Sequence, residues 1–290
     1  MRLTRDTALC YVPDGMPEAE ALARITHLGI GAHQDDLEFM AFHGILAGYH
    51  MEGKWFGGVT CTDGAGSARS GPFASCTDEE MCLIRKKEQN TAAEIGGYGA
   101  MIQLDHPSRD IKGRGYAGLT SDLTDILTAT RPDVVYTHNP ADKHDTHVAV
   151  VVTTLQAVRA LPPEQRPRQV LGCEVWRGLD WMMDKEKIAL EVGGNDDLAT
   201  TLNSVFASQI SGGKRYDLAT MGRRRANATF LDSHCVDGME QCWYAMDLSP
   251  LVRDDALDIV DYVEGHISRF AHDVRVRLTR QQGADPLAAP

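Results

Sequence analysis

A polar turn between an apolar strand and a helix is the feature that most constrains the fold of this 290-residue chain. Apolar residues run from Ile25 to Ile30, and residues 27–31 have the length and composition of a short buried strand. Leu37 to Tyr49 follows as the predicted helix. In open α/β sheets, ligands bind beside such a turn, at the carboxyl end of a strand. The sequence therefore predicts an α/β fold with a site at the end of this strand.

Three side chains in the turn can carry out chemistry: the imidazole of His33 and the adjacent carboxylates of Asp35 and Asp36. If the first helical turn begins near Gln34, His33 and Asp36 are three residues apart and point the same way, whereas Asp35 points elsewhere. The two carboxylates can therefore have different roles. We expect Asp36 to bind a metal ion and Asp35 to act on the water that the metal holds.

A second polar cluster, residues 138–147, follows another strand candidate, Asp133 to Thr137. His144 and His147 are three residues apart, directly before an apolar helix expected over residues 148–160. One face of the first turn of that helix could present both imidazoles to the first cluster. Three His and Asp ligands with a fourth position open to water are typical of a catalytic zinc site.

The two clusters resemble the motifs of the zinc-dependent deacetylases of the PIG-L (LmbE-like) family, which remove acetyl groups from N-acetylglucosamine-type amino sugars. The first family motif is A-H-P-D-D-x-E, where this chain has Ala32-His33-Gln34-Asp35-Asp36-Leu37-Glu38. The second is H-x-x-H, where the chain has His144-Asp145-Thr146-His147. The resemblance covers the first half of the chain well and the second half poorly.

Carried over position by position, the resemblance implies one Zn²⁺ ion per chain, held by His33, Asp36 and His147. It also implies that Asp35 is the general base and that His144 stabilises or protonates the tetrahedral intermediate. The implied function is hydrolysis of the acetyl amide of an N-acetylated amino sugar of the GlcNAc type, or of its conjugate. Either Asp35 or His144 would return a proton to the leaving amine.

Two positions depart from the family pattern. Gln34 replaces the usual proline, which relaxes the φ restriction of the turn but removes no ligand. Asp145-Thr146 stands where many members have Pro-Asp, so the aspartate often found beside the last zinc histidine is shifted by one position. This shift leaves open which carboxylate orients His147 or His144.

Four further residues are candidates for contact with the substrate. Asp63 follows the second predicted strand, although ordinary turn chemistry would also explain it. Arg85 aligns with an arginine that family members use on the sugar or phosphate group of the substrate, but it also suits a solvated helix face. Trp176 could stack on a sugar ring or belong to the core. His234 lies in the divergent half, where family members place residues that close the substrate pocket.

Predicted strands and helices alternate along the chain, which favours a parallel sheet covered by helices. The predicted strands are residues 27–31, Trp55 to Cys61, Ala100 to Asp105, Asp133 to His138, Gln169 to Val175 and Lys187 to Val192. The predicted helices are Leu37 to Tyr49, Asp78 to Gly96, Leu119 to Thr130 and Val148 to Ala160. We expect a Rossmann-like, mostly parallel sheet with helices on both faces. It would form a single domain over residues 1–290, with residues 281–290 as a flexible tail.

The net charge of −12 argues against a nucleic-acid partner and against attraction to an anionic membrane surface. No apolar stretch approaches the roughly eighteen residues of a membrane span, and residues 1–6 are not followed by the apolar segment of a secretory signal. The seven cysteines contain no Cys-x-x-Cys pair, which suggests reduced thiols. We therefore expect a cytoplasmic protein that acts on a small amino-sugar molecule, with homo-oligomer formation left open.

Two other functions stay open. A zinc amidase could act on a non-sugar amide, such as a thiol conjugate or an acylated natural product, and substrate profiling would distinguish it. A non-catalytic, metal-dependent carbohydrate-binding protein would have no use for Asp35 as a general base. A dinucleotide-dependent oxidoreductase is disfavoured, because Gly113 to Gly118 matches G-x-G-x-x-G without a preceding strand. A serine hydrolase of the α/β type is disfavoured, because no G-x-S-x-G motif is present.

Overall fold

The computed structural model describes residues 1–113 and 115–283. Its centre is one eight-stranded sheet with the strand order β1-β4-β3-β2-β5-β6-β8-β7. The strands are β1 (Leu9–Tyr11), β2 (His27–Gly31), β3 (Phe56–Thr62), β4 (Ala100–His106), β5 (Val134–His138), β6 (Gln169–Cys173), β7 (Lys187–Glu191) and β8 (Cys242–Asp247). The block from β4 to β6 is parallel, whereas β1, β8 and β7 pair antiparallel at the two edges. The prediction of an α/β fold with a mostly parallel sheet is therefore confirmed.

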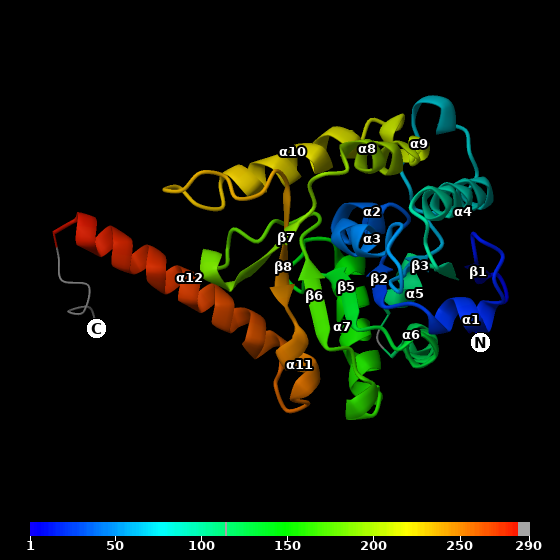
Figure 1. Ribbon diagram of the computed structural model, residues 1–290, viewed down its shortest axis with the longest axis horizontal. Coiled ribbons are helices and arrows are strands. Elements are labelled where there is room, and N and C mark those ends of the chain that lie inside the picture. Colours follow the sequence, from blue (N-terminus) through cyan, green and yellow to red (C-terminus); the bar gives the residue numbers. More distant parts are fainter. Residues whose placement is uncertain (114, 284–290) are drawn as a thin grey trace.

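Helices cover both faces of the sheet, as Figure 1 shows. The α-helices are α1 (Glu18–Ala23), α2 (Asp36–Met40), α3 (Phe42–Gly48), α4 (Asp78–Ile95), α5 (Ser108–Ile111), α6 (Ala117–Thr130), α7 (Asp145–Ala160), α8 (Asp196–Ser204), α9 (Ala207–Ile210), α10 (Tyr216–Thr229), α11 (Ser249–Arg253) and α12 (Ile259–Gln281). One buried apolar cluster joins the sheet to α1, α6, α7 and α11, and a second joins it to α2, α3, α4 and α8. None of the described helices is long and apolar enough to cross a lipid bilayer.

The strand order reverses between β2 and β5. From β2 the chain continues to β3 and β4 on one side, and then returns to β5 and β6 on the other side. β2 and β5 are direct neighbours, with Gly29 opposite Tyr136. Because the two polar clusters follow these neighbouring parallel strands, they meet at one edge of the sheet, at the switch point where such folds bind ligands.

Gly29 allows α2 to lie close against β2. Its neighbours Leu28 and Ile30 belong to the apolar cluster on the other face of the sheet. A Cβ atom at position 29 would lie 2.7 Å from Cζ of Phe56 and 2.9 Å from Cδ2 of Leu37. The close approach therefore depends on the absence of a side chain, and it fixes where the first residues of α2 stand.

The predicted elements up to β7 are confirmed to within a few residues, with one exception. The helix predicted over Leu37 to Tyr49 is wrong as a single element, because Ala41 has φ −107° and ψ 17° and separates α2 from α3. The sequence did not predict the strands β1 and β8, the short helices α1 and α5, or the helices from α8 to α12. The expected tail 281–290 begins within α12, and residues 284–290 lie outside the described residues.

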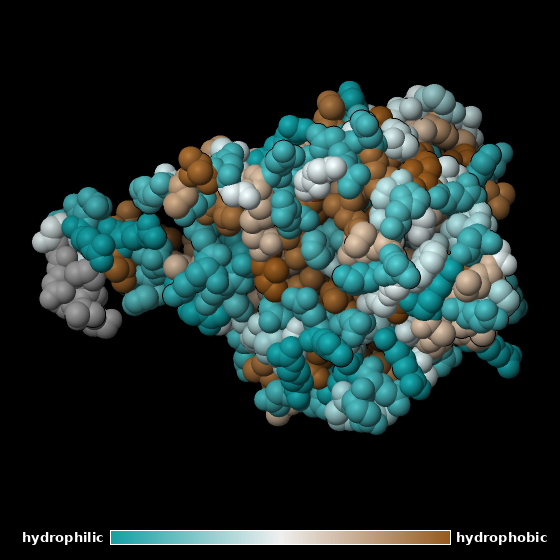
Figure 2. Space-filling model, in the orientation of Figure 1, coloured by the Kyte–Doolittle hydropathy of each residue, from teal (hydrophilic) through white to brown (hydrophobic). Residues whose placement is uncertain are grey.

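Helix α12 leaves the body of the molecule at the end of the described chain. Its second half stands apart from the sheet and from the other helices (Figure 1). Figure 2 shows this half as an arm on which apolar side chains lie among polar ones.

We expect Gly29→Ala to lower the free energy of unfolding by about 1–3 kcal/mol, because the new methyl group forces α2 or Phe56 away from β2. Urea denaturation followed by circular dichroism measures the change. Gly222→Ala in α10 is the matched control, because a Cβ there meets nothing within 4 Å. Equal stability of the Gly29 variant and the parent would show that the packing of α2 on β2 is looser than the structure indicates.

Candidate metal centre

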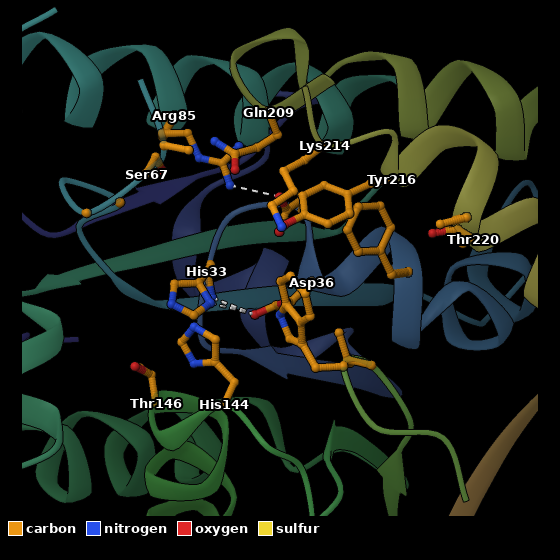
Figure 3. A pocket seen from close by; sticks show the side chains of 18 of the residues that line it. His33, Asp36, Ser67, Arg85, His144, Thr146, Gln209, Lys214, Tyr216 and Thr220 are labelled. Carbon is orange, nitrogen blue, oxygen red and sulfur yellow. Dashed lines mark hydrogen bonds and ion pairs between the residues drawn. The ribbon is translucent and has the colours of Figure 1, made fainter. Parts of the chain in front are cut away.

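A cavity of about 500 Å³ lies beside the carboxyl ends of β2 and β5. His33, Asp35 and Asp36 from the first cluster line it together with His144 from the second. Figure 3 shows the imidazoles of His33 and His144 next to each other, with the carboxylate of Asp36 beside His33. The structure thus brings the two sequence clusters into one site.

The three residues expected to bind metal converge on one point. Nδ1 of His33 lies 3.3 Å from Oδ2 of Asp36, and Nε2 of His147 lies 3.5 Å from the same oxygen. The two histidine nitrogens are 3.3 Å apart. Asp36 and His147 are buried, whereas the side chain of His33 is 23% exposed. His33 and Asp36 both line the cavity, so the cluster can be reached from it.

The turn between β2 and α2 has an uncommon backbone conformation. Asp35 precedes the first residue of α2 and has φ 94°, in the left-handed region. Such a conformation costs about 1–3 kcal/mol for most non-glycine residues, although aspartate tolerates it better than most. The backbone N–H of Asp35 donates to Oε1 of Gln89 (3.1 Å), and that of His33 donates to Oδ2 of Asp36 (2.7 Å). These bonds hold the two neighbouring carboxylates in different surroundings.

Asp35 faces Arg85 and not the histidines. Nη2 of Arg85 lies 3.0 Å from Oδ2 of Asp35, and Arg85 also donates to the backbone carbonyl of Gln34. Burial raises the pKa of Asp35 to about 6, and the Arg85 guanidinium acts in the opposite direction. Asp35 is therefore a carboxylate that can exchange a proton near neutral pH.

Asp36 is held as an anion among imidazoles. Burial acts to raise its pKa, but His147 and His138 outweigh burial and hold the pKa well below its usual range. Burial acts to lower the pKa of His147, but Asp36 and Asp142 raise it overall. A carboxylate surrounded by imidazoles in this way offers the donor atoms that a divalent cation binds.

The described residues fit a metal ion. One ligand atom from each of Asp36, His138 and His147 lies within 4.8 Å of the others, and the same holds for His33, His144 and His147. Nδ1 of His144 is buried and has no hydrogen-bond partner in the described part of the chain. Nitrogen donors from histidine combined with a carboxylate oxygen are the donor set that suits Zn²⁺.

Two residues of the second cluster were missed as candidates. Nε2 of His138 accepts a hydrogen bond from the backbone N–H of Ala32 (2.9 Å) and lies 3.4 Å from Oδ2 of Asp36. Its ring stacks on that of His147, with 3.8 Å between ring centroids. Burial and the neighbouring His147 lower the pKa of His138 to about 4, so it is neutral. Its position at the end of β5, within the polar run, was the signal in the sequence.

Asp142 supplies the carboxylate whose position the sequence left open. Its Oδ2 lies 3.4 Å from Nδ1 of His147, and its Oδ1 accepts a hydrogen bond from the backbone N–H of His144 (3.1 Å). Burial acts to raise the pKa of Asp142, but the hydrogen bond with His147 lowers it below its usual value. A carboxylate on the outer nitrogen of a metal-binding histidine fixes the orientation of the ring. Asp142, which precedes the second motif, thus takes the place of the aspartate that is shifted by one position within the motif.

His144 lies directly before α7, at the mouth of the centre. Its ring stacks on that of His147, with centroids 4.6 Å apart, and meets that of His33 edge-on at 4.9 Å. Burial, followed by the two neighbouring imidazoles, lowers the pKa of His144 to about 4. At neutral pH this side chain is therefore an uncharged N–H donor or acceptor.

The structure brings two of the four substrate candidates to the cavity. Arg85 and Trp176 line it, and the Trp176 ring is stacked toward His144 with centroids 6.3 Å apart. Asp63 is not among the lining residues, and its Oδ1 accepts a hydrogen bond from the backbone N–H of Ala65 (3.1 Å), which is turn chemistry. His234 is exposed on the loop between α10 and β8, and it too lies outside the lining.

The opposite wall of the cavity comes from the second half of the chain. Lys214 and Tyr216, beside the start of α10, reach toward the cavity from above the histidines (Figure 3). The Lys214 ammonium lies 5.1 Å from the Trp176 ring centroid, and the ring of Tyr216 meets Trp176 edge-on at 5.9 Å. Burial raises the pKa of Tyr216, so its hydroxyl keeps its proton. No motif marks these residues, because only the fold brings α10 to the switch point.

The sequence of residues 28–158 matches the model of the PIG-L family, described as GlcNAc-PI de-N-acetylase. The match covers a little less than half of the chain. The family resemblance given by the two motifs is therefore confirmed. The matched segment contains Asp35, Arg85 and the candidate metal ligands, which are His33, Asp36, His138, His144 and His147. No protein of curated function matches the chain.

Several solved structures share the fold at low sequence identity. N,N'-diacetylchitobiose deacetylase from Pyrococcus horikoshii is 17% identical with a TM-score of 0.61, over 82% of this chain and 88% of that one. The A40926 pseudoaglycone deacetylase Dbv21 is 17% identical with a TM-score of 0.57, over 78% and 98%. The 4-carboxy-2-hydroxymuconate hydratase from Pseudomonas putida is 17% identical with a TM-score of 0.56, over 77% and 96%. Because one fold carries both deacetylases and a hydratase, the likeness establishes the fold alone.

We expect His147→Ala to lose most of its bound zinc, because the substitution removes the donor that is shared by both clusters of ligand atoms. Elemental analysis of the protein after dialysis against excess Zn²⁺ and then buffer measures the metal per chain. His272→Ala on the exposed face of α12 is the matched control and should keep the parental metal content. Full zinc occupancy in the His147 variant would contradict the ligand assignment.

Proposed function

We propose that this chain is a zinc-dependent hydrolase that removes the acetyl group from an N-acetylated amino sugar of the GlcNAc type, or from its conjugate. The observation that carries the proposal is Asp35, a carboxylate beside the metal cluster that forms its ion pair with Arg85 and not with the histidines. A binding site for metal and sugar alone has no use for such a group. The PIG-L family match over residues 28–158 supports the choice of an acetyl amide as the substrate bond.

Within this proposal, His33, Asp36 and His147 hold the ion, and Asp142 and His138 support them. A bound Zn²⁺ ion lowers the pKa of water toward about 7 and polarises the carbonyl group of the substrate. Asp35 takes a proton from the attacking water, since a pKa of about 6 keeps the carboxylate mainly ionised at neutral pH. The same group then carries the proton that the departing amine requires.

His144 stabilises the carbonyl oxygen as negative charge develops on it. The family resemblance implied that His144 stabilises or protonates the intermediate, and its lowered pKa of about 4 favours stabilisation by the neutral ring. A neutral imidazole still donates one N–H hydrogen bond, and a donor fixed in a partly buried site stabilises an oxyanion without further reorganisation. Asp142 holds the backbone of His144 in place for this role.

The cavity suits a small polar ring next to the metal. Its volume of about 500 Å³ is within the usual range for sites that bind small molecules. Trp176 offers an aromatic face beside His144, and Tyr216 offers a protonated hydroxyl on the opposite wall. We assign substrate contact to Trp176 and Arg85. Asp63 and His234 are left without a role, because they do not line the cavity.

A free-amine release assay on a panel of N-acetyl sugars and N-acyl non-sugar amides tests the function directly. Release of acetate and amine from an N-acetylated amino sugar by the zinc-loaded protein is the expected result. Turnover only of a thiol conjugate or another non-sugar amide would retain the amidase chemistry and overturn the sugar assignment. Sugar binding without any hydrolysis would overturn the proposal that the protein is an enzyme.

We expect Asp35→Asn to reduce turnover by about 10²–10⁴-fold, because the amide cannot accept the proton of the attacking water. The zinc content should stay at the parental value, since Asp35 is not assigned as a ligand. Turnover and elemental analysis on the same preparation separate the two effects. Parental activity with intact metal would mean that another group is the base.

We expect the acid limb of the pH profile of kcat/KM to report Asp35, because the base works only when ionised. Activity should fall as the pH drops through the Asp35 pKa, which lies at about 6. The Arg85 cation lowers that pKa, so Arg85→Met should raise it and move the acid limb to higher pH. Lys87→Met in the same helix, α4, removes an exposed cation and is the control. An unmoved limb in the Arg85 variant would contradict the assignment of Asp35 as the base.

A further inference from the structure

Helix α12 is attached to the body through its first half only. The Tyr262 hydroxyl donates to the backbone carbonyl of Asp247 (2.6 Å). Nδ1 of His266 and Nε of Arg269 lie 2.9 and 2.6 Å from the two carboxylate oxygens of Glu186. Among the described residues, no hydrogen bond or ion pair joins 270–281 to the rest of the fold. The second half is therefore an arm that extends from the body (Figure 1).

An apolar stripe runs along this helix on a side that the body does not cover. The stripe consists of Val260, Ile267, Ala271, Val274 and Leu278. Their spacings of seven, four, three and four residues place them within about 60° of arc around the helix axis. The four larger side chains are 59%, 44%, 39% and 60% exposed, in chain order. A long helix that presents such a stripe to solvent lacks the surface against which the stripe is normally buried.

The charges of α12 are divided between its two halves. The first half carries Asp261 and Glu264, with Asp258 directly before it, and its one arginine, Arg269, is paired with Glu186 of the body. The second half carries Arg275, Arg277 and Arg280, and its one acidic residue, Asp273, is paired with Arg277. This division also suits the helix dipole, so the charges alone do not require a partner. The exposed apolar stripe is the observation that points to a partner, and the charges then select which partner fits.

We propose that α12 pairs antiparallel with α12 of a second copy of this chain, with the two apolar stripes packed against each other. An antiparallel pair sets the acidic half of each helix against the basic half of the other. A parallel pair would set acid against acid and base against base. The proposal concerns a surface distant from the metal centre and does not depend on the proposed function.

Glu264 and Arg275 give the pairing a specific register. Both lie on the same flank of the stripe, about 20° apart around the axis, and neither forms an ion pair within the described part of the chain. When two antiparallel helices are related by a two-fold axis, equivalent flanks meet. Glu264 of each copy then faces Arg275 of the other, so the interface contains this pair twice.

Sedimentation equilibrium of the full chain at micromolar concentrations tests the proposal. The expected result is a monomer–dimer equilibrium, because a single helix pair is small beside the roughly 800 Å² per partner of a standard stable interface. Ile267→Asp combined with Val274→Asp should raise the dimer dissociation constant about a hundredfold or more, since each charge is buried twice. Leu83→Asp, which replaces a 69% exposed apolar residue of α4, is the matched control and should leave the equilibrium unchanged.

Charge reversal tests the orientation. Glu264→Arg or Arg275→Glu alone should weaken the dimer several-fold, because each places like charges opposite each other at both ends. The double variant E264R/R275E should regain the parental dissociation constant. A wild-type chain that stays monomeric, a dimer unaffected by the stripe variant, or a double variant no better than the single ones would overturn the proposal. Monomeric chain that binds anionic vesicles through the stripe would assign α12 to a lipid surface instead.

Discussion

The site depends on one carboxylate oxygen, Oδ2 of Asp36. It accepts a hydrogen bond from the backbone N–H of His33, and it lies within 3.5 Å of imidazole nitrogens from His33, His138 and His147. Burying an anion is costly unless other groups compensate its charge. Here the backbone N–H of His33 donates to it, and the imidazole of His147, whose pKa Asp36 raises, lies beside it. The same arrangement that makes the anion tolerable in the protein interior prepares a site for a divalent cation.

Further buried groups hold the turn in the conformation that this oxygen requires. Gln89, in α4, accepts the backbone N–H of Asp35 with one atom of its amide and donates to Glu38 with the other. The Tyr98 hydroxyl also donates to Glu38, and burial raises the pKa of Glu38 to about 7. Glu38, the last acidic residue of the first motif, therefore stabilises the turn through Gln89. It takes no part in the metal cluster, although the motif places it only two residues from Asp36.

The comparison with solved structures separates fold from chemistry. A deacetylase and a hydratase share this α/β arrangement with the chain, so the sheet and its switch point do not select a reaction. In our proposal the reaction is selected by the groups at the switch point, above all by Asp35, which is paired with Arg85 beside the candidate metal ligands. In the same proposal the substrate is selected by the cavity wall from the second half of the chain, whose residues no sequence motif marks.

The sequence by itself determined the parallel part of the sheet and the two strand ends that carry the site. It also determined which residues meet there: His33, Asp35, Asp36, His144 and His147. These follow from local patterns: a short apolar run, a polar turn and a helix, repeated in neighbouring strands. The roles of Asp142, His138 and Tyr216 were decided by tertiary structure, because each acts through a partner that is distant in sequence or on another element. The same reason explains why strand β8, whose partners are β6 and β7, was missed. It also explains why the pairing of Arg85 with Asp35 could not be predicted, since a sequence pattern cannot distinguish Arg85 from a solvated helix residue. Periodicity reports which face of an element is apolar, but only the folded chain decides which elements meet there.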